Sequence, residues 1–226
     1  MRFHVITIFP EMFDSYLNES IIGRAIKNKK ISVRFYNPRD FIKAPKNNYR
    51  PVDDKPYGGG PGMVMRAEPI LKAVNKAFLV AKGKKILIIN FIPSAEKFTT
   101  ISAKNISKKY TDVILICGRY EGIDARVDKI LKTKKFSIGD YVVTGGELPS
   151  MIAIDSISRQ IPGVLGTYES LEEERISSSE VYTRPEILRY PLGKSKGKKV
   201  RNYKVPKVLL SGNHKKIEEW KKALPS

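Results

Sequence analysis

The stretch DVILICGRYEGID, residues 112–124, decides how the rest of the sequence is interpreted. Its first half, up to Cys117, is an apolar run of strand length, which is typical of a strand buried on both faces. Its second half places an arginine, a tyrosine and a glutamate between Gly118 and Gly122, and glycine permits a tight loop with close backbone approach. Such a loop is either an ordinary surface turn or, as often in parallel sheets, part of a ligand site.

Strand-like and helix-like segments alternate on both sides of this stretch. The expected strands are 1–9, 32–36, 85–91, 112–117 and 135–143, and the expected helices are 11–29, 67–81, 94–110, 123–131 and 148–159. This alternation predicts an α/β fold, a mostly parallel sheet with helices on both faces. An unusual loop follows each of the last three strands: NFIPSAEK (90–97), CGRYEGID (117–124) and IGDYVVTGGELP (138–149). Because ligands bind beyond the carboxyl ends of parallel strands, we expect these loops to form one pocket.

Composition divides the chain into three parts. Residues 1–160 carry the α/β pattern, 161–180 are polar with little apolar periodicity, and 181–226 are basic. The middle part is interpreted as an interdomain linker that orders only when a ligand binds. The last part predicts a small, mainly helical C-terminal domain. About 45 residues are too few for a core of their own, so we expect it to pack on the first domain or on another copy.

The overall charge indicates a polyanionic partner. The chain has 42 Lys and Arg against 23 Asp and Glu, a formal net charge of +19 and a pI near 9.9. Nucleic acid is the expected partner, and a generally lysine-rich composition is the alternative. The single cysteine excludes an internal disulfide, and two histidines exclude the usual Cys/His zinc sites, so no metal site is assigned. No apolar run is long enough to span a membrane, and we expect a soluble, cytoplasmic protein.

Several motifs can carry chemistry, and each has a plainer explanation. The sequence lacks a Walker motif and has no GxGxxG after the first strand, which excludes Rossmann-type nucleotide binding. The segment PYGGGPGM (56–63) offers backbone amides to a base or a phosphate, or is a flexible loop. The linker contains four acids, Glu169, Glu172, Glu173 and Glu174. They either form a solvated surface or include a general base that acts on a bound substrate. Arg159 stabilises negative charge on an oxygen, or only complements a helix dipole.

Nine segments, in collinear order over nearly the whole chain, carry a family resemblance. They are FPEMF (9–13), GRA (23–25), PRD (38–40), VDDKPYGGGPGM (52–63), CGRYEGID (117–124), SIGDYVVTGGELP (137–149), DSISRQIPGVLG (155–166), YTRPE (182–186) and VLLSGNH (208–214). Together they resemble the bacterial tRNA (guanine-N1)-methyltransferases, which methylate the guanosine 3′ of the anticodon, position 37.

The resemblance implies a SPOUT-type fold with a trefoil knot at the end of the sheet, and a homodimer with the active site between subunits. S-adenosylmethionine would lie in the knot loops, against Pro93, Gly118, Tyr120, Glu121, Gly122, Ile138, Gly139, Asp140, Tyr141, Val142, Val143, Gly145 and Gly146. The tRNA anticodon arm would contact Arg24, Asp53, Tyr57, Gly58, Pro61, Gly62, Thr183, Arg184 and His214. The resemblance also implies a magnesium requirement.

The chemistry implied by the resemblance is methyl transfer to N1 of guanine with removal of the N1 proton. Glu174 would be the general base, and Arg159 would hydrogen-bond guanine O6. Glu174 stands where the family pattern has an aspartate, so Glu172 or Glu173 is an alternative base. In a second departure, Phe91-Ile92-Pro93 replaces a Leu-Ser-Pro segment. The third is a C-terminus that is shorter after Trp220 than the family pattern, and we expect the lysine-rich insertion at 193–201 to replace some of the lost RNA contacts. The altered Glu174 region leaves a second hypothesis, a catalytically weakened tRNA-binding protein on the same scaffold. A third hypothesis is a phosphate-binding enzyme of small metabolites, and the basic C-terminal domain counts against it.

Overall fold

The computed structural model describes residues 1–43, 49–81, 83, 85–165, 180–190 and 201–223. The chain forms two compact units, Met1–Gly166 and Thr167–Ser226, and the boundary falls inside the stretch that we assign to a linker. Glu169, Glu172, Glu173 and Glu174 lie outside the described residues, as does most of the lysine-rich insertion.

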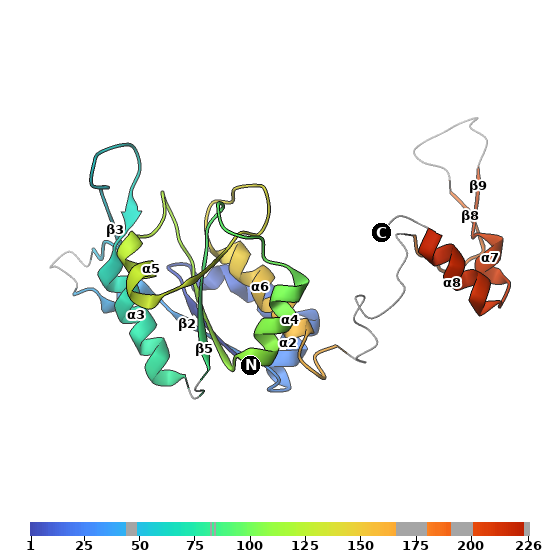
Figure 1. The fold of residues 1–226 in the computed structure, drawn as a ribbon, viewed down its shortest axis with the longest axis horizontal. Coiled ribbons are helices and arrows are strands. Elements are labelled where there is room, and N and C mark those ends of the chain that lie inside the picture. The colour runs from blue at the N-terminus through green and yellow to red at the C-terminus, as the bar shows by residue number, and fades with distance from the viewer. Residues whose placement is uncertain (44–48, 82, 84, 166–179, 191–200, 224–226) are drawn as a thin grey trace. The chain divides into compact units, whose positions relative to one another are not determined.

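The first unit is built on a five-stranded parallel sheet (Figure 1). Its strands are β1 (Arg2–Ile6), β2 (Ser32–Tyr36), β5 (Ile86–Phe91), β6 (Asp112–Ile116) and β7 (Lys134–Phe136), in the order β2-β1-β6-β5-β7. Every pairing in this sheet is parallel. The predicted α/β class is therefore confirmed, and β6, the strand that precedes the glycine-flanked loop, occupies the centre of the sheet.

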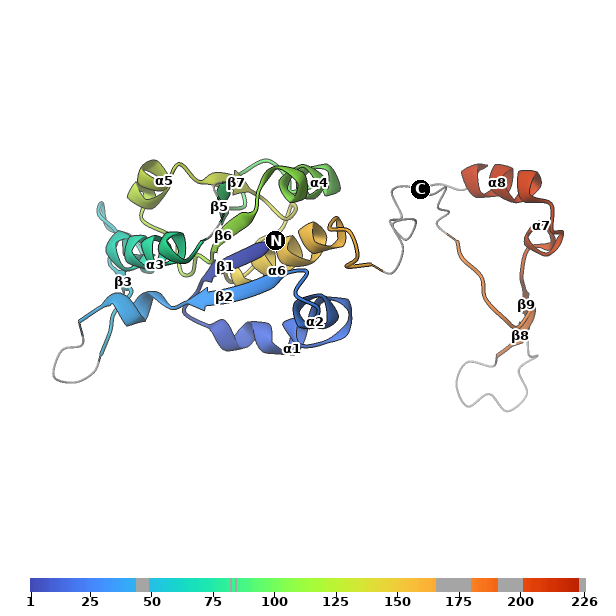
Figure 2. The same cartoon turned by 90° about the horizontal axis from the view of Figure 1, so that it is seen from below.

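Helices cover both faces of the sheet (Figure 2). On one face lie α3 (Ala67–Val80) and α5 (Ala125–Leu131), and on the other lie α1 (Asp14–Leu17), α2 (Ser20–Lys27), α4 (Thr100–Lys109) and α6 (Glu147–Arg159). The apolar run of β6 serves both layers, because successive side chains of a strand point to opposite faces. Val113 and Leu115 pack in the cluster with α4 and α6, whereas Ile114 and Ile116 pack in the cluster with α3 and α5.

The largest differences from the sequence prediction concern three elements. The expected helix 11–29 is divided into a 3-10 turn, η1 (Pro10–Phe13), then α1 and α2, with Ser20 at a φ of 54° at the break. The expected helix 94–110 begins only at Thr100, because the side chain of Thr99 caps it by accepting a hydrogen bond from the Ser102 amide. The expected strand 135–143 ends at Phe136, and Gly139 beyond it has a φ of 151°.

A second 3-10 turn and a short hairpin complete the first unit. The turn η2 (Pro38–Phe41) follows β2, and the hairpin pairs β3 (Asp53–Asp54) with β4 (Val64–Met65). The trefoil knot implied by the resemblance remains a prediction.

The amino ends of the central strands are held by one buried carboxylate. Asp112 accepts hydrogen bonds of 2.7 Å from both Nε and Nη2 of Arg2, and its Oδ1 lies 3.1 Å from Nε2 of buried His4. Thr111 donates a further hydrogen bond. Burial alone would raise the pKa of Asp112, but these hydrogen bonds and the charge of Arg2 lower it to about 2. This network lies at the opposite edge of the sheet from the loops that follow the strands.

The second unit is small and has no buried residue among those described. It contains an antiparallel ribbon of β8 (Ile187–Arg189) and β9 (Asn202–Lys204), followed by α7 (Lys207–Leu210) and α8 (His214–Ala223). The rings of Tyr182 and Trp220 pack together with their centroids 6.4 Å apart. A hollow of about 750 Å³ is lined by residues 182–186, Val205, Leu209 and Leu210. The sequence predicted one short helix around Ile217 and Trp220, which corresponds to α8, but neither α7 nor the ribbon.

We expect Asp112→Asn to lower the melting temperature at pH 7, because the neutral amide cannot pair with Arg2. The pKa of Asp112 falls from 3.8 to about 2 on folding, so its ionised form stabilises the fold above about pH 4. That contribution is lost as the pH falls through about 2, and the gap between variant and wild type should close over this interval. Thermal unfolding followed by circular dichroism measures this difference in melting temperature at each pH.

As a control, Asp140→Asn should change the melting temperature little, since the ion pair of Asp140 with Lys97 is largely exposed. A gap that is absent at pH 7, or constant down to pH 2, contradicts this account.

Candidate functional site

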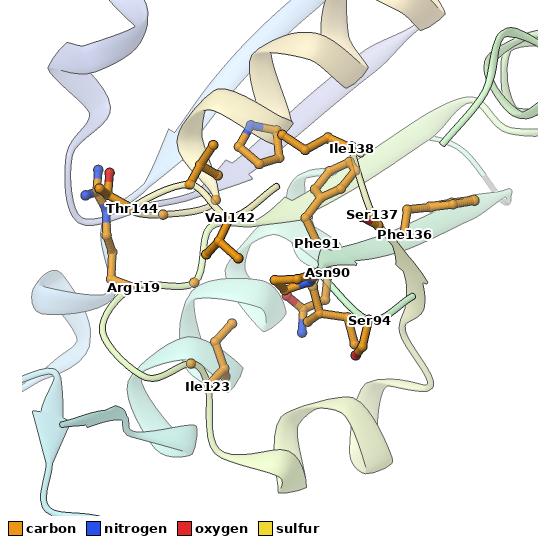
Figure 3. Close-up of a pocket in the computed structure, with 18 of the residues that line it drawn as sticks. Asn90, Phe91, Ser94, Arg119, Ile123, Phe136, Ser137, Ile138, Val142 and Thr144 are labelled. Carbon is orange, nitrogen blue, oxygen red and sulfur yellow. The ribbon is translucent and has the colours of Figure 1, made fainter. Parts of the chain in front are cut away.

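A cavity of about 510 Å³ lies at the carboxyl ends of β5, β6 and β7 (Figure 3). The loops that leave these strands line it through residues 90–94, 118–123, 136–138 and 141–146, joined by Asp128 and Pro149. The three strands are neighbours in the sheet, so their loops open on the same edge. The predicted common pocket therefore exists, and its volume is in the range of small-molecule and cofactor sites.

The loop after β6 has a fixed conformation. Tyr120 and Gly122 have positive φ angles of 61° and 125°, which turn the chain sharply. The loop is also hydrogen-bonded to the β3–β4 hairpin: the amide of Glu121 donates to the carbonyl of Met63 at 3.0 Å, and the amide of Met65 donates to the carbonyl of Gly122 at 2.9 Å. The stretch between two glycines is therefore a built wall of the cavity rather than a free surface turn.

Two consecutive glycines press the loop after β7 against the loop after β6. The amide of Gly146 donates to the carbonyl of Gly118 at 2.8 Å. A Cβ on Gly146 would lie 2.6 Å from Cα of Cys117, and one on Gly145 would lie 2.4 Å from Nε of Arg119. At Gly146 the clash is with backbone, so glycine is required there for the two loops to meet, whereas at Gly145 a side chain would have to displace the Arg119 side chain.

A buried charge pair lies directly behind this contact. Glu147, the first residue of α6, is fully buried, and its Oε2 lies 2.9 Å from Nε of Arg119. The hydroxyl of Thr7 donates to the other carboxylate oxygen at 2.8 Å. The Arg119 guanidinium carbon lies 4.8 Å from the centre of the exposed Phe9 ring. Sequence reasoning missed Glu147 and Arg119 as a pair, although charged residues beside paired glycines were a signal.

The other side of the cavity, around Asn90 in Figure 3, is polar. The Asn90 amide nitrogen donates to Oδ1 of Asp128 at 3.1 Å, and the Thr133 hydroxyl donates to the same oxygen at 2.6 Å. Nζ of Lys135 lies 2.8 Å from Oδ2 of Asp128. Burial alone would raise the pKa of Asp128, but these partners lower it below its ordinary value. The carboxylate is therefore ionised at neutral pH, and sequence reasoning did not find it.

Cys117 is not a nucleophile in this site. It is 1% exposed, and its Sγ lies 3.2 Å from Oγ of Ser150. Burial first, and then the nearby charge of Glu147, raise the pKa of the thiol, so the reactive thiolate is suppressed. The residue is a small core side chain.

Most residues assigned to the cofactor lie around the cavity. The lining includes Pro93, Gly118, Tyr120, Glu121, Gly122, Ile138, Tyr141, Val142, Val143, Gly145 and Gly146. Gly139 and Asp140 are not part of it, and Asp140 instead pairs with Lys97 at 2.6 Å.

Arg159 lies far from the cavity of its own chain. It is the last residue of α6, whereas Pro149, near the beginning of the same helix, lines the cavity. From Pro149 to Arg159 the helix rises about 15 Å at 1.5 Å per residue. The structure thus does not bring Arg159 to this cavity within one chain.

The residues assigned to tRNA occur in three places. Arg24 lies on α2, and Thr183, Arg184 and His214 lie in the second unit, where Thr183 and Arg184 line the hollow. The hairpin between β3 and β4 carries Asp53, Tyr57, Gly58, Pro61 and Gly62. A Cβ on Gly62 would lie 2.5 Å from the Glu121 side chain, so the hairpin touches the cavity wall. The Tyr57 side chain is fully exposed.

A family model described as "tRNA (Guanine-1)-methyltransferase TrmD" matches residues 1–225. The chain belongs to this tRNA (guanine-1)-methyltransferase family. Among its relatives, the "tRNA (guanine-N(1)-)-methyltransferase" of Clostridioides difficile is 46% identical over 98% of this chain and 91% of its own length. A protein of the same name from Buchnera aphidicola is 43% identical over 97% of this chain and 87% of its own length.

A solved structure of the same kind resembles this chain. The tRNA (m1G37) methyltransferase from Aquifex aeolicus has a TM-score of 0.74 and 39% sequence identity, with 98% of this chain and 87% of that chain covered. The fold of the tRNA (guanine-1)-methyltransferase family thus extends over both units. Within the described part of the chain, none of the helices combines the length and apolarity needed to span a bilayer.

We expect Gly146→Ala to disrupt the site, because its methyl group would overlap the backbone of Cys117 and Gly118. The loops must separate, so binding of S-adenosylhomocysteine, measured by calorimetry, should weaken by at least about tenfold. The control is Ser156→Ala, in the middle of α6, which should leave binding unchanged. Wild-type affinity in Gly146→Ala would show that the two loops need not touch.

Proposed function

We propose that this protein transfers a methyl group from S-adenosylmethionine to N1 of the guanosine at position 37 of tRNA. The observation that carries the proposal is the cavity formed by the loops after β5, β6 and β7, in a chain that matches the family over residues 1–225. A catalytically weakened tRNA-binding protein is not favoured, since the relatives described above are named as methyltransferases.

The cavity fits the methyl donor in size and chemistry. It is bordered by apolar side chains such as Pro93, Ile138 and Val143, and by glycine backbone that a flat adenine can approach closely. The polar groups Glu121 and Asp128 stand at its edge for ribose hydroxyls or an amino group. S-adenosylmethionine supplies an electrophilic methyl group on a sulfonium. The protein's part is to bind it so that N1 of guanine can approach in line.

Proton removal is assigned to the linker. N1 of guanine must lose its proton to become a nucleophile, and a carboxylate with an ordinary pKa of about 4 is ionised and can accept it. Glu174 is the proposed base, with Glu172 and Glu173 as the alternatives. As N1 loses its proton, negative charge develops on guanine O6, and the Arg159 guanidinium stabilises it by a hydrogen bond.

This assignment requires a second copy of the chain. Arg159 stands about 15 Å along α6 from Pro149, which lines the cavity of its own chain, and a helix cannot shorten to close that gap. We therefore propose a homodimer in which Arg159 of one copy serves the cavity of the other.

Exposed apolar side chains on η1, α1 and α6 offer a face for this dimer: Phe9, Met12, Tyr16, Leu148 and Ile152. These elements are close in space, because the Tyr16 hydroxyl donates to Asp155 of α6, and η1 itself contacts α6. A contiguous apolar face rimmed by polar groups is typical of a protein interface.

The basic charge then has its partner in tRNA. The target guanosine is unpaired in the anticodon loop, so moving it out of its stack costs little. Arg24 and the β3–β4 hairpin would hold the nucleotide, and Thr183, Arg184 and His214 would contact the anticodon arm. In this assignment residues 1–160 are the methyltransferase domain, 181–226 bind tRNA, and the enzyme works in the cytoplasm.

No step is assigned to the magnesium ion that the resemblance implies. Among the described residues, no group of three or more His, Cys, Asp or Glu side chains is placed to hold a metal ion.

Single-turnover methylation of a tRNA transcript with guanosine at position 37 tests the proposal. We expect Glu174→Gln to lower the rate by about a hundredfold or more, because the amide cannot accept the proton. Glu173→Gln is the matched control and should keep nearly the full rate. Arg159→Lys should also be slow, since lysine does not reproduce the guanidinium geometry.

Two outcomes contradict parts of this proposal. Wild-type protein that transfers no methyl group to the transcript would overturn the function. A full rate in Glu174→Gln together with a slow Glu173→Gln would move the general base to the neighbouring residue.

A further inference from the structure

The β8–β9 ribbon of the second unit is exposed on both faces. Its pairing places Ile187 opposite Lys204, Leu188 opposite Tyr203, and Arg189 opposite Asn202. All six residues are exposed. The ribbon stands off to one side of α7 and α8 within this unit (Figure 2). A two-stranded ribbon without a covered face is only marginally stable in water, so a partner that covers it would stabilise it.

The two faces of the ribbon differ in chemistry. Residues directly opposite each other share a face, and successive residues of a strand alternate between faces. If the same register is extended one residue beyond the paired strands, it puts Tyr190 on the face of Leu188 and Arg201 on the face of Tyr203. We define the tyrosine face as Leu188, Tyr190, Arg201 and Tyr203, and the cationic face as Ile187, Arg189, Asn202 and Lys204.

The tyrosine face presents aromatic rings to solvent. Tyr190 is 62% exposed and Tyr203 is 54% exposed, and Leu188 beside them is 49% exposed. Neither tyrosine has a ring-stacking partner among the described residues. Exposed aromatic rings on a small sheet are the arrangement that stacks unpaired bases.

The charge of the ribbon selects the partner. Arg189, Arg201 and Lys204 are exposed cations, neither strand contains an acid, and among the residues that flank the strands (186, 190, 201 and 205) Glu186 is the one acid. An apolar protein partner would have to desolvate these cations, whereas a nucleic-acid backbone pairs with them. The combination of stacking rings and phosphate-binding cations favours single-stranded RNA over a protein surface.

We propose that the β8–β9 ribbon binds unpaired nucleotides of the RNA substrate, with bases stacked on the tyrosine face and phosphates held by the cationic face. This deepens the proposed function and rests on it, and it adds a contact surface beyond Thr183, Arg184 and His214. Since each stacked base contributes substantially to affinity, loss of both rings is expected to weaken RNA binding rather than to slow the methyl-transfer step.

The test is binding of fluorescently labelled tRNA transcript to the full-length chain, measured by anisotropy over a range of salt concentrations. Tyr190→Ala/Tyr203→Ala should raise the Kd by about tenfold or more, whereas Tyr190→Phe/Tyr203→Phe should stay within about twofold because stacking is kept. Arg189→Gln/Lys204→Gln should reduce the slope of log Kd against log salt by about 1.4, since each phosphate contact on a single strand contributes about 0.7.

The matched control removes the same charge elsewhere. Lys76→Gln/Lys108→Gln changes two exposed lysines on α3 and α4 and should leave the Kd and the slope as in the wild type. Calorimetric binding of S-adenosylhomocysteine should be unchanged in every variant, because the ribbon is in the other unit from the cavity.

Three results would overturn the inference while the wild type still binds and methylates tRNA. These are a wild-type Kd in the tyrosine-to-alanine variant, a salt slope that falls equally in the lysine control, and a changed oligomeric state in ultracentrifugation without a changed RNA affinity. The last would show that the ribbon faces a protein. A wild-type chain that neither binds nor methylates tRNA would instead overturn the proposed function.

Discussion

The close approach of Gly145 and Gly146 to the end of β6 is the constraint on which the rest of the site depends. With Gly146 hydrogen-bonded to Gly118 at 2.8 Å, the loop after β7 returns across the sheet edge and closes one side of the cavity. The same contact fixes where α6 starts, because Glu147, the first residue of α6, directly follows Gly146. Any side chain at these glycines would overlap atoms of residues 117–119, so the loops, the cavity and the direction of α6 are fixed together.

Two buried carboxylates, Asp112 and Glu147, have different roles at the two ends of the parallel strands. At the amino ends of the strands, Asp112 is saturated by Arg2, His4 and Thr111, and this edge is devoted to stability. At the carboxyl ends, Glu147 holds Arg119, whose guanidinium covers the Phe9 ring. Because Phe9 belongs to the apolar face proposed for the dimer, this second network joins the cavity wall to that face. Dimerisation and donor binding would then stabilise the same loop.

Local sequence patterns predicted most of the sheet and the position of the cavity. The alternation of apolar segments is a local signal, and glycines after strands mark loops that cannot be ordinary strand or helix, so the three loops could be grouped. Contacts between distant residues could not be predicted in this way. Glu147 and Arg119 are 28 positions apart, and the Asp128 network joins residues from β5, α5 and β7. Helix propensity also failed to predict the break between α1 and α2, where Ser20 has a positive φ and a Cβ on Gly23 would lie 2.6 Å from the Asn18 backbone. The β8–β9 ribbon has no alternation of buried and exposed residues, which is why no strand was expected there.

Hydrogen–deuterium exchange of the full chain with and without S-adenosylhomocysteine tests most directly whether the cavity holds the methyl donor. The account predicts slower amide exchange in residues 118–123 and 138–146 when the ligand is present, and unchanged exchange in α3 and in the second unit. Unchanged exchange in both loops at saturating ligand, or protection confined to the β3–β4 hairpin, would contradict it.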